Sequence, residues 1–397
     1  MATTPIMILL FIGYIIFTID KKKENFPVPL ILIVVGIGLS FIPYFSSIEV
    51  TKDMIYHVFL PGLLFTSAYR FSPNALKRNA GIISFLATIG IMLTVLFLGW
   101  TIYVVSGLFV SLSLVGSMLI AAMLTPTDPV SIVSILKKSS GDEMMADVVE
   151  GESLINDGTS IVIFTVILSI FLHDKTFSIR SFLGEFLFVS IGGMLIGLVF
   201  GWLFSKAIHI THHKEYQVML SIVLAYGIFN TAEHFGVSGV LATVFAGIML
   251  SFEFNRSLQE DHFRESLDGF WSVVEISILS LLFLLIGVES TSYLAFDYWV
   301  LASLIFVASL LVRFLIIAGA TQTFPVWRHT INWRESLLLS WSGLKGSMSV
   351  FLILNLQAQE AQGTELILSL TFAAVLLSLV VQSIGIHPLS KKLLNRG

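Results

Sequence analysis

The 397-residue sequence contains no cysteine, and only 12% of its residues are charged. The absence of cysteine excludes disulfide bonds, thiol catalysis and cysteine-ligated metals. The charged share is about half that of an ordinary soluble domain, which is too little to cover a globule in water. The net charge of −4 gives no reason to expect nucleic acid as a partner. The sequence is instead rich in apolar residues, at 56%, and lipid is its expected solvent.

Apolar runs long enough to cross a bilayer recur along the whole chain, which predicts an all-α polytopic membrane protein. Polar interruptions divide these runs into about 13 transmembrane helices. The expected spans are residues 5–19, 27–45, 54–70, 80–105, 111–136, 147–172, 182–208, 215–232, 236–254, 270–288, 294–322, 334–356 and 366–387. We expect residues 1–397 to form a single transmembrane domain with no soluble regulatory domain. We expect no cleaved signal peptide, because Lys21, Lys22 and Lys23 follow the first apolar run and do not precede it.

Basic residues are concentrated in alternate loops of this arrangement. Seventeen of the 22 Lys and Arg residues lie in one set of loops, whereas the other set holds only Lys52, Lys175 and Arg180. Short cytoplasmic loops carry most of the basic residues of a membrane protein. We therefore predict a multi-pass protein of the cell (inner) membrane, with its N-terminus outside and its C-terminus in the cytoplasm.

Two of the spans contain residues that interrupt a helix. Residues 125–129 read Thr-Pro-Thr-Asp-Pro, and residues 342–347 contain two glycines and a lysine. Each proline removes a backbone donor and leaves a carbonyl without its helical partner. The two spans are seven apart and so cross the membrane in opposite directions, as in inverted-repeat transporters with discontinuous crossing helices. We predict two inverted six-helix repeats, at 5–172 and 215–387, linked by the span at 182–208.

Several ionisable side chains fall inside the predicted spans. They are Asp128, Glu152, Asp157, Glu275, Arg313 and Lys345. A charge at the bilayer centre costs on the order of 3 kcal/mol on insertion scales. Any one of these residues could be a snorkelling or structurally paired side chain. Three acids in two adjacent spans favour a functional site.

The sixth span carries two polar stripes when it is placed on a helix. Glu150, Ser153 and Asp157 share one face, and Glu152 and Asn156 share the neighbouring face. The first stripe offers carboxylate and hydroxyl oxygens, which suit a hard cation such as sodium or lithium. Glu150, nearer the cytoplasm, could attract cations at the mouth of a pathway, or be an interfacial acid favoured by the helix dipole.

Arg313 is the arginine placed deep enough in a span to pair with the second stripe. We expect it to bind Glu152 and Asn156, which leaves Asp157 without a cationic partner. A buried carboxylate in that state can hold either a proton or a metal ion, so the two would compete for Asp157. Thr127, Asp128 and the freed carbonyls around them would complete an oxygen shell. Lys345 is expected to offset the partial charges of the broken helix ends.

The motifs Thr125-Pro126-Thr127-Asp128-Pro129 and, 22 residues later, Gly151-Glu152-Ser153-Leu154-Ile155-Asn156-Asp157 resemble the monovalent cation:proton antiporters. The resemblance is to the sodium/proton exchangers and their NhaP-type prokaryotic relatives. Later segments look like further family signatures in the expected order, namely 237–242, 280–287, Arg313 and 343–346. The resemblance spans nearly the whole chain.

This resemblance implies a transporter and not an enzyme, working by alternating access as a homodimer, with sodium and protons as substrates and no cofactor. It implies that Asp157 carries the ion or the proton. The same analogy places Thr127, Asp128 and Ser153 at the sodium site, and makes Glu152, Asn156 and Arg313 a stabilising triad. In this family an asparagine before the aspartate accompanies electroneutral exchange, so Asn156 predicts electroneutrality.

The sequence departs from the family pattern at two positions. Thr66 stands where many relatives carry an acid after a Leu-Pro pair, so Thr66 could alter ion selectivity or affinity. Lys345 stands where exchangers often have arginine. The long cytoplasmic regulatory tail of the animal exchangers is absent, and tail-dependent regulation is not expected.

Other functions fit the residues less well. A potassium/proton antiporter of the same fold remains the alternative, because oxygen ligands alone do not set the size of a cavity. An intramembrane protease would need a Gly-x-Gly-Asp or His-Glu-x-x-His signature, and neither occurs. A channel would need a repeated filter sequence, which is also missing.

Three further sequence features give weaker predictions. Gly193, Gly197 and Gly201 form a small-residue ridge, expected to pack within the protomer and not at a dimer interface. Glu275 has no partner that the sequence assigns. His209, His212 and His213 could sense pH or lie at a solvated loop edge.

Overall fold

The computed structural model describes residues 3–23, 28–46, 51–128, 133, 136, 143–173, 179–210, 213–254, 261–294, 296–328, 331–361 and 363–394. Nearly all of these described residues are helical, and none of them forms a β-strand. The predicted all-helical fold class is therefore confirmed.

Within the described residues, each predicted span coincides with one helix or with consecutive helical segments, and most of the span at 111–136 beyond residue 128 lies outside these residues. The first half of the chain forms α1 (Thr3–Lys23), α2 (Val28–Ser40), α3 (Pro43–Ser46), η1 (Met54–Phe59), α4 (Leu60–Arg70), α5 (Pro73–Phe85), η2 (Leu86–Gly90), α6 (Ile91–Ser106), α7 (Leu114–Met123) and α9 (Glu143–His173). The second half forms α10 (Ile179–Ile210), α11 (Lys214–His234), α12 (Gly239–Phe254), α13 (Asp261–Leu294), α14 (Trp299–Thr323), α15 (Pro325–Arg328), α16 (Trp333–Trp341), α17 (Ser347–Gln357) and α18 (Glu365–Leu394).

Length and composition identify the helices that could cross a bilayer. Within the described ranges, six helical segments are long and apolar enough to do so, and five shorter apolar helices accompany them. The shorter ones include α7 and α17, the helices that border the two predicted interruptions. The number of thirteen crossings remains a prediction.

Helix ends coincide with local capping residues. Asn332 begins α16 with a capping box, in which its side chain accepts from the N–H groups of Arg334 and Glu335. The Glu335 carboxylate accepts in return from the N–H of Asn332 at 2.7 Å. Ser72 and Ser113 cap α5 and α7 because their hydroxyl oxygens accept from the backbone N–H groups of Ala75 and Gly116. These caps fix where the helices begin, because they satisfy N–H groups that have no partner inside the helix.

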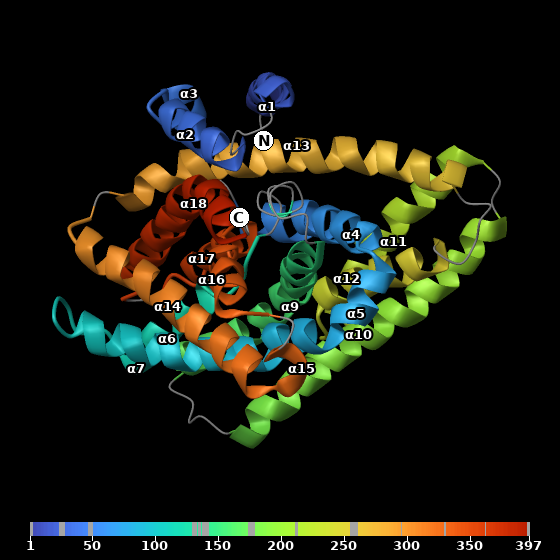
Figure 1. The fold of residues 1–397 in the computed structure, drawn as a ribbon. Coiled ribbons are helices and arrows are strands. Elements are labelled where there is room, and N and C mark those ends of the chain that lie inside the picture. Colours follow the sequence, from blue (N-terminus) through green and yellow to red (C-terminus); the bar gives the residue numbers. More distant parts are fainter. Residues whose placement is uncertain are drawn as a thin grey trace.

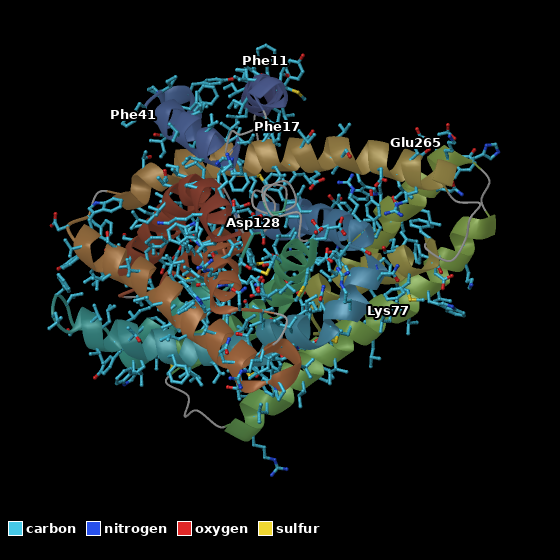
Figure 2. The ribbon with its side chains drawn as sticks, viewed as in Figure 1. Phe11, Phe17, Phe41, Lys77, Asp128 and Glu265 are labelled. Carbon is cyan, nitrogen blue, oxygen red and sulfur yellow. The ribbon has the colours of Figure 1, made fainter. Side chains whose placement is uncertain are left out.

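Helix α9 lies in the middle of the bundle, and α1 and α2 lie on the outer side of the long helix α13 (Figure 1). In its most apolar segment, 67% of α9 residues are buried, compared with 28% for α10, which runs along the periphery. Phe11 and Phe41 project from the outer surface, whereas Asp128 lies in the interior (Figure 2). The polar stripes of α9 therefore face protein and not lipid.

The glycine ridge of α10 packs against α12 of the same chain. A Cβ atom at Gly193 would lie 2.6 Å from the carbonyl oxygen of Ser238, and one at Gly197 would collide with that of Ala242. Small residues allow two helices to approach this closely. The prediction that the ridge packs within the protomer is confirmed.

Candidate ion-binding site

The two interrupted spans cross each other through their non-helical segments. Residues 125–128 follow the end of α7, and residues 342–346 separate α16 from α17. The N–H of Asp128 donates to the carbonyl of Leu344 at 2.8 Å. Backbone groups that lose their helical hydrogen bonds inside a membrane need other partners. Here the first interruption supplies the donor and the second supplies the acceptor. Pro129, the last residue of the first interruption, lies outside the described residues.

Two glycines allow the segments to meet. A Cβ atom at Gly343 would lie 2.6 Å from Nε of Arg313 and 3.1 Å from the methyl group of Thr127. A Cβ atom at Gly346 would collide with the side chain of Asp128. Larger residues at these positions would push the crossing segments apart.

Helix α9 binds this crossing through its polar stripe. The hydroxyl of Ser153 donates to the carbonyl of Thr127, and the side-chain amide of Asn156 donates to the Thr127 hydroxyl at 2.7 Å. Both α9 residues are fully enclosed. These two bonds fix the interruption at Thr127 against α9.

Arg313 and Glu152 form a buried ion pair. Nη2 of Arg313 lies 2.7 Å from Oε2 of Glu152, and the two side chains are 11% and 3% exposed. The side-chain amide of Asn156 donates to Thr127, whereas the sequence predicted that Asn156 would bind Arg313. Nε of Arg313 and Oδ1 of Asn156 have no hydrogen-bond partner among the described residues. The structure thus brings Glu152 and Arg313 together and places Asn156 beside the ion cavity.

A cavity of about 50 Å³ lies beside the crossing. Its polar lining comprises Ser67, Thr127, Asp128, Ser153, Asp157 and Ser347. One water-sized particle needs roughly 10–15 Å³ of such space, so the cavity has room for a small cation with some of its water. Oδ1 of Asp157 is buried and makes no hydrogen bond within the described part of the chain. The geometry leaves this oxygen available to a proton or a metal ion.

The remaining sequence candidates lie around this cavity. Lys345 is 5% exposed, and its backbone N–H donates to the hydroxyl of Ser378 at 2.9 Å. Glu150 is half-buried on α9 and does not line the cavity.

Thr66 does not take the position near the ion site that the sequence predicted. Thr66 is buried away from the cavity lining, and its hydroxyl donates to the carbonyl of Gly62 at 2.7 Å. Ser67, the next residue, lines the cavity. Helix α4 therefore contributes a neutral hydroxyl to the site.

Glu275 does have a partner, which the sequence reading missed. Its carboxylate accepts from Nη1 of Arg70 at 2.6 Å. Arg70 ends the predicted span at 54–70 and is also the last residue of α4. No local pattern in the sequence indicates this pairing, because the two residues lie 205 positions apart. His213 is exposed and contacts the ring of Tyr216, whereas His212 lies outside the described residues.

A second cavity of about 430 Å³ lies one helical turn away from the first. On η1 and α4, Leu60 lines the small cavity and Tyr56 lines the large one. On α17, Met348 lines the small cavity and Phe351 lines the large one. On α9, Asp157 lines the small cavity, and the lining of the large one begins at residue 161. A single layer of side chains therefore separates the two cavities.

The rings of Tyr56 and Phe351 line the large cavity on the side of this layer. They stack with centroids 4.5 Å apart and an angle of 10° between their planes. The Tyr56 hydroxyl donates to Oε1 of Glu233 at 2.8 Å, which fixes the ring at the wall of the large cavity. The layer closes the candidate site on that side.

The donor set of the small cavity suits a hard monovalent cation. It combines two carboxylates with hydroxyl and carbonyl oxygens, all of them hard ligands. In the described part of the chain, no group of three or more His, Cys, Asp or Glu side chains gathers as a divalent metal centre would require. Two acids can hold one small cation, or protons in its place.

The family model for the transmembrane domain of sodium/hydrogen exchangers matches residues 6–392. The chain belongs to this family. It is 34% identical over 392 residues to the Na(+)/H(+) antiporter NhaG of Bacillus atrophaeus, covering 95% of this chain and 72% of that one. It is 32% identical over 403 residues to NhaH of Halobacillus dabanensis, covering 98% and 97%.

The fold also matches that of a solved structure. The sodium proton antiporter MjNhaP1 from Methanocaldococcus jannaschii superimposes with a TM-score of 0.79 and 20% sequence identity, over 100% of this chain and 99% of that one. The resemblance inferred from the Thr-Asp-Pro and Asn-Asp motifs is confirmed at the level of family and fold.

Proposed function

We propose that this chain is a secondary active antiporter that exchanges protons for sodium or lithium across the membrane. The observation that carries the proposal is Oδ1 of Asp157, a buried carboxylate oxygen without a hydrogen-bond partner among the described residues, in a cavity that it shares with Asp128. The names of the bacterial relatives, Na(+)/H(+) antiporters, support the choice of substrates.

Competition for Asp157 couples the two fluxes. A buried carboxylate holds its charge at a cost, which either a proton or a metal ion relieves. With a proton bound, sodium is excluded, and with sodium bound, the proton is released. The charge of Asp157 is compensated when either a proton or sodium is bound, so the loaded site can switch its access from one side of the membrane to the other. The empty site carries an uncompensated charge, which prevents this switch. Exchange without leak follows from this rule.

Thr127, Ser153 and Asp128 complete the ion shell in this proposal. The Thr127 carbonyl keeps a second lone pair beside the hydrogen bond that it accepts from Ser153. The Glu152–Arg313 pair holds α9 and α14 together and does not touch the ion. Lys345 offsets the helix ends that converge at the crossing.

Alternating access requires that the layer between the two cavities opens. Tyr56 comes from η1 and Phe351 from α17, so the stack joins helices from different halves of the chain. We propose that relative movement of the two sides breaks this stack and connects Asp157 to the large cavity. In the orientation with seventeen basic residues in the cytoplasm, the large cavity faces outside.

The same proposal includes one-for-one, electroneutral exchange. Asn156 is neutral and donates to Thr127, so it adds no further charge beside Asp157. We also propose that spans 5–172 and 215–387 are inverted repeats, that the protein works as a homodimer in the cell membrane, and that its N-terminus is outside. A potassium/proton exchange at the same site remains the second candidate, because the oxygen ligands do not discriminate between the two ions.

Proton flux in proteoliposomes tests the proposed function. Purified protein is reconstituted with a pH dye inside, and sodium, lithium or potassium is added with and without a clamped membrane potential. We expect proton movement driven by sodium and lithium that the clamp does not change. A response to potassium alone would transfer the assignment to the second candidate, and no response to any cation would overturn the antiporter.

A further inference from the structure

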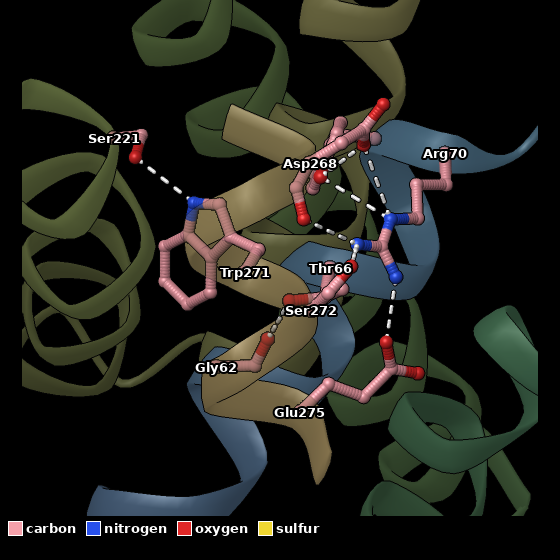
Figure 3. A network of polar contacts seen from close by, with 9 residues as sticks. Gly62, Thr66, Arg70, Ser221, Asp268, Trp271, Ser272 and Glu275 are labelled. Carbon is pink, nitrogen blue, oxygen red and sulfur yellow. Dashed lines mark hydrogen bonds and ion pairs between the residues drawn. The ribbon is translucent and has the colours of Figure 1, made fainter. Parts of the chain in front are cut away.

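The guanidinium of Arg70 is surrounded by acceptors from α13 (Figure 3). Nη1 donates to Glu275 at 2.6 Å, and Nη2 donates to the hydroxyl of Ser272 at 2.7 Å and to the backbone carbonyl of Asp268 at 3.2 Å. Nε lies 3.3 Å from the carboxylate of Asp268, which also accepts from the Tyr69 hydroxyl at 2.6 Å. All three nitrogen atoms are engaged, so the charge of Arg70 is fixed in place.

This cluster borders the candidate ion cavity on two helices. Ser67, one turn before Arg70 on α4, lines the cavity, and so does Leu279, one turn after Glu275 on α13. One turn of helix is about 5 Å along its axis. In the proposed orientation both helices lead from the cavity toward the cytoplasm here, so Arg70 and Glu275 stand at its cytoplasmic side.

The charges of the cluster are unequal and partly exposed. Two carboxylates face one guanidinium, and the side chains of Arg70, Glu275 and Asp268 are 29%, 21% and 41% exposed. Such an exposed pair contributes little to stability, yet its field acts on ions that pass nearby. Helix α4 places no carboxylate on the cavity itself, since Ser67 lines it and Thr66 is turned away.

We propose that Arg70 and Glu275 set the affinity of this exchanger for cytoplasmic sodium without touching the ion. Arg70 lowers the local concentration of cations at the entrance, and Glu275 raises it. Removing one unit charge about 10 Å from the ion path changes that concentration on the order of threefold. The inference rests on the proposed sodium/proton exchange and deepens it, because it assigns the entrance charge to a named pair.

The electrostatic role and a purely structural role predict different signs. If the ion pair only held α4 and α13 together, loss of either partner would impair exchange in the same way. If the charges act on the ion, Arg70→Gln lowers the KM for sodium about threefold and Glu275→Gln raises it by a similar factor. The double variant then returns near the wild-type KM.

The test measures proton movement in inside-out membrane vesicles, where added sodium reaches the cytoplasmic side. The variants are Arg70→Gln, Glu275→Gln, the double variant and the charge-preserving control Arg70→Lys, each assayed at low salt and with added choline chloride. We expect opposite KM shifts with little change in kcat, a wild-type KM for Arg70→Lys, and shifts that shrink as choline chloride screens the charges.

Three results would overturn the inference: KM shifts of the same sign in both single variants, changes confined to kcat, or shifts that salt does not reduce. Asp268→Asn removes a carboxylate of the same cluster and must raise the KM as Glu275→Gln does, so the test stands even if one variant fails to fold. If the wild-type protein shows no sodium-driven proton movement, the proposed function fails, which is a distinct result.

Discussion

The N–H of Asp128 donates to the carbonyl of Leu344 at 2.8 Å and thereby joins two interruptions that lie in opposite halves of the chain. Each interruption frees backbone groups inside the membrane, and their crossing satisfies some of them without water. The same contact places Asp128 beside Asp157 in one cavity. The ion site is thus a consequence of how the two broken helices meet.

Gly346→Ala tests the close approach on which this crossing depends. The added methyl group would collide with the side chain of Asp128, so we expect exchange to be lost and the free energy of unfolding to fall by about 1–3 kcal/mol. The matched control is Gly319→Ala on α14, where an added Cβ meets no atom within 4 Å. Thermal unfolding in detergent and vesicle exchange are the measurements. Normal exchange in Gly346→Ala would contradict the packing described.

Arg313→Ala leaves the carboxylate of Glu152 buried without its cation. Breaking a buried pair in this way costs about 3–5 kcal/mol, so we expect a large drop in thermal stability. Adding Glu152→Gln to Arg313→Ala removes the uncompensated charge and should recover part of the loss. A single variant that is as stable as wild type but inactive would show instead that Arg313 acts on the ion.

Asn156→Asp adds a charge beside Asp157 and removes the amide that donates to Thr127. We expect exchange to become sensitive to membrane potential, since the site then carries one more negative charge through the cycle. Asn156→Ala loses the same hydrogen bond without gaining charge and should stay insensitive to potential. The measurement is proton flux in proteoliposomes at several clamped potentials. If Asn156→Asp remains insensitive, stoichiometry is set elsewhere.

Tyr56→Ala removes half of the stack that separates the two cavities. The chain contains no cysteine, so the Met348→Cys variant places a single thiol in the small cavity, on the far side of this layer from the large cavity. We expect a membrane-impermeant thiol reagent added outside to label it several times faster when Tyr56→Ala is also present. Asn355→Cys, in the large cavity, should label equally fast in both backgrounds. Equal labelling rates for Met348→Cys would argue that the layer is not the barrier.

Much of this fold could be predicted because its signals are local. Apolar length, the Pro-rich segment at 125–129 and the glycines around Lys345 depend on neighbouring residues alone. The i, i+4 relation of Glu152 and Asn156 is likewise a property of one helix, and it identified the stripe that receives Arg313.

The remainder depends on how helices are rotated relative to one another, which a single sequence does not specify. The π-helical segment η1 (Met54–Phe59) immediately precedes α4, an irregularity that neighbouring residue types do not predict. Ser67 lines the cavity, and Thr66 does not. Arg70 pairs with Glu275, 205 positions away, a partner that no local pattern could indicate.

Sodium and a proton compete for Asp157 in the proposed mechanism, and calorimetry of sodium binding measures this competition. Titrating sodium into the purified protein in two buffers with different ionisation enthalpies gives the number of protons released per ion. We expect about one proton released per sodium bound near the pH where the site is protonated, and no sodium binding in Asp157→Asn. The control Glu150→Gln, on the same helix but outside the cavity lining, should bind as wild type does. Sodium binding without proton release, or binding retained in Asp157→Asn, would show that the two ions do not compete for this carboxylate.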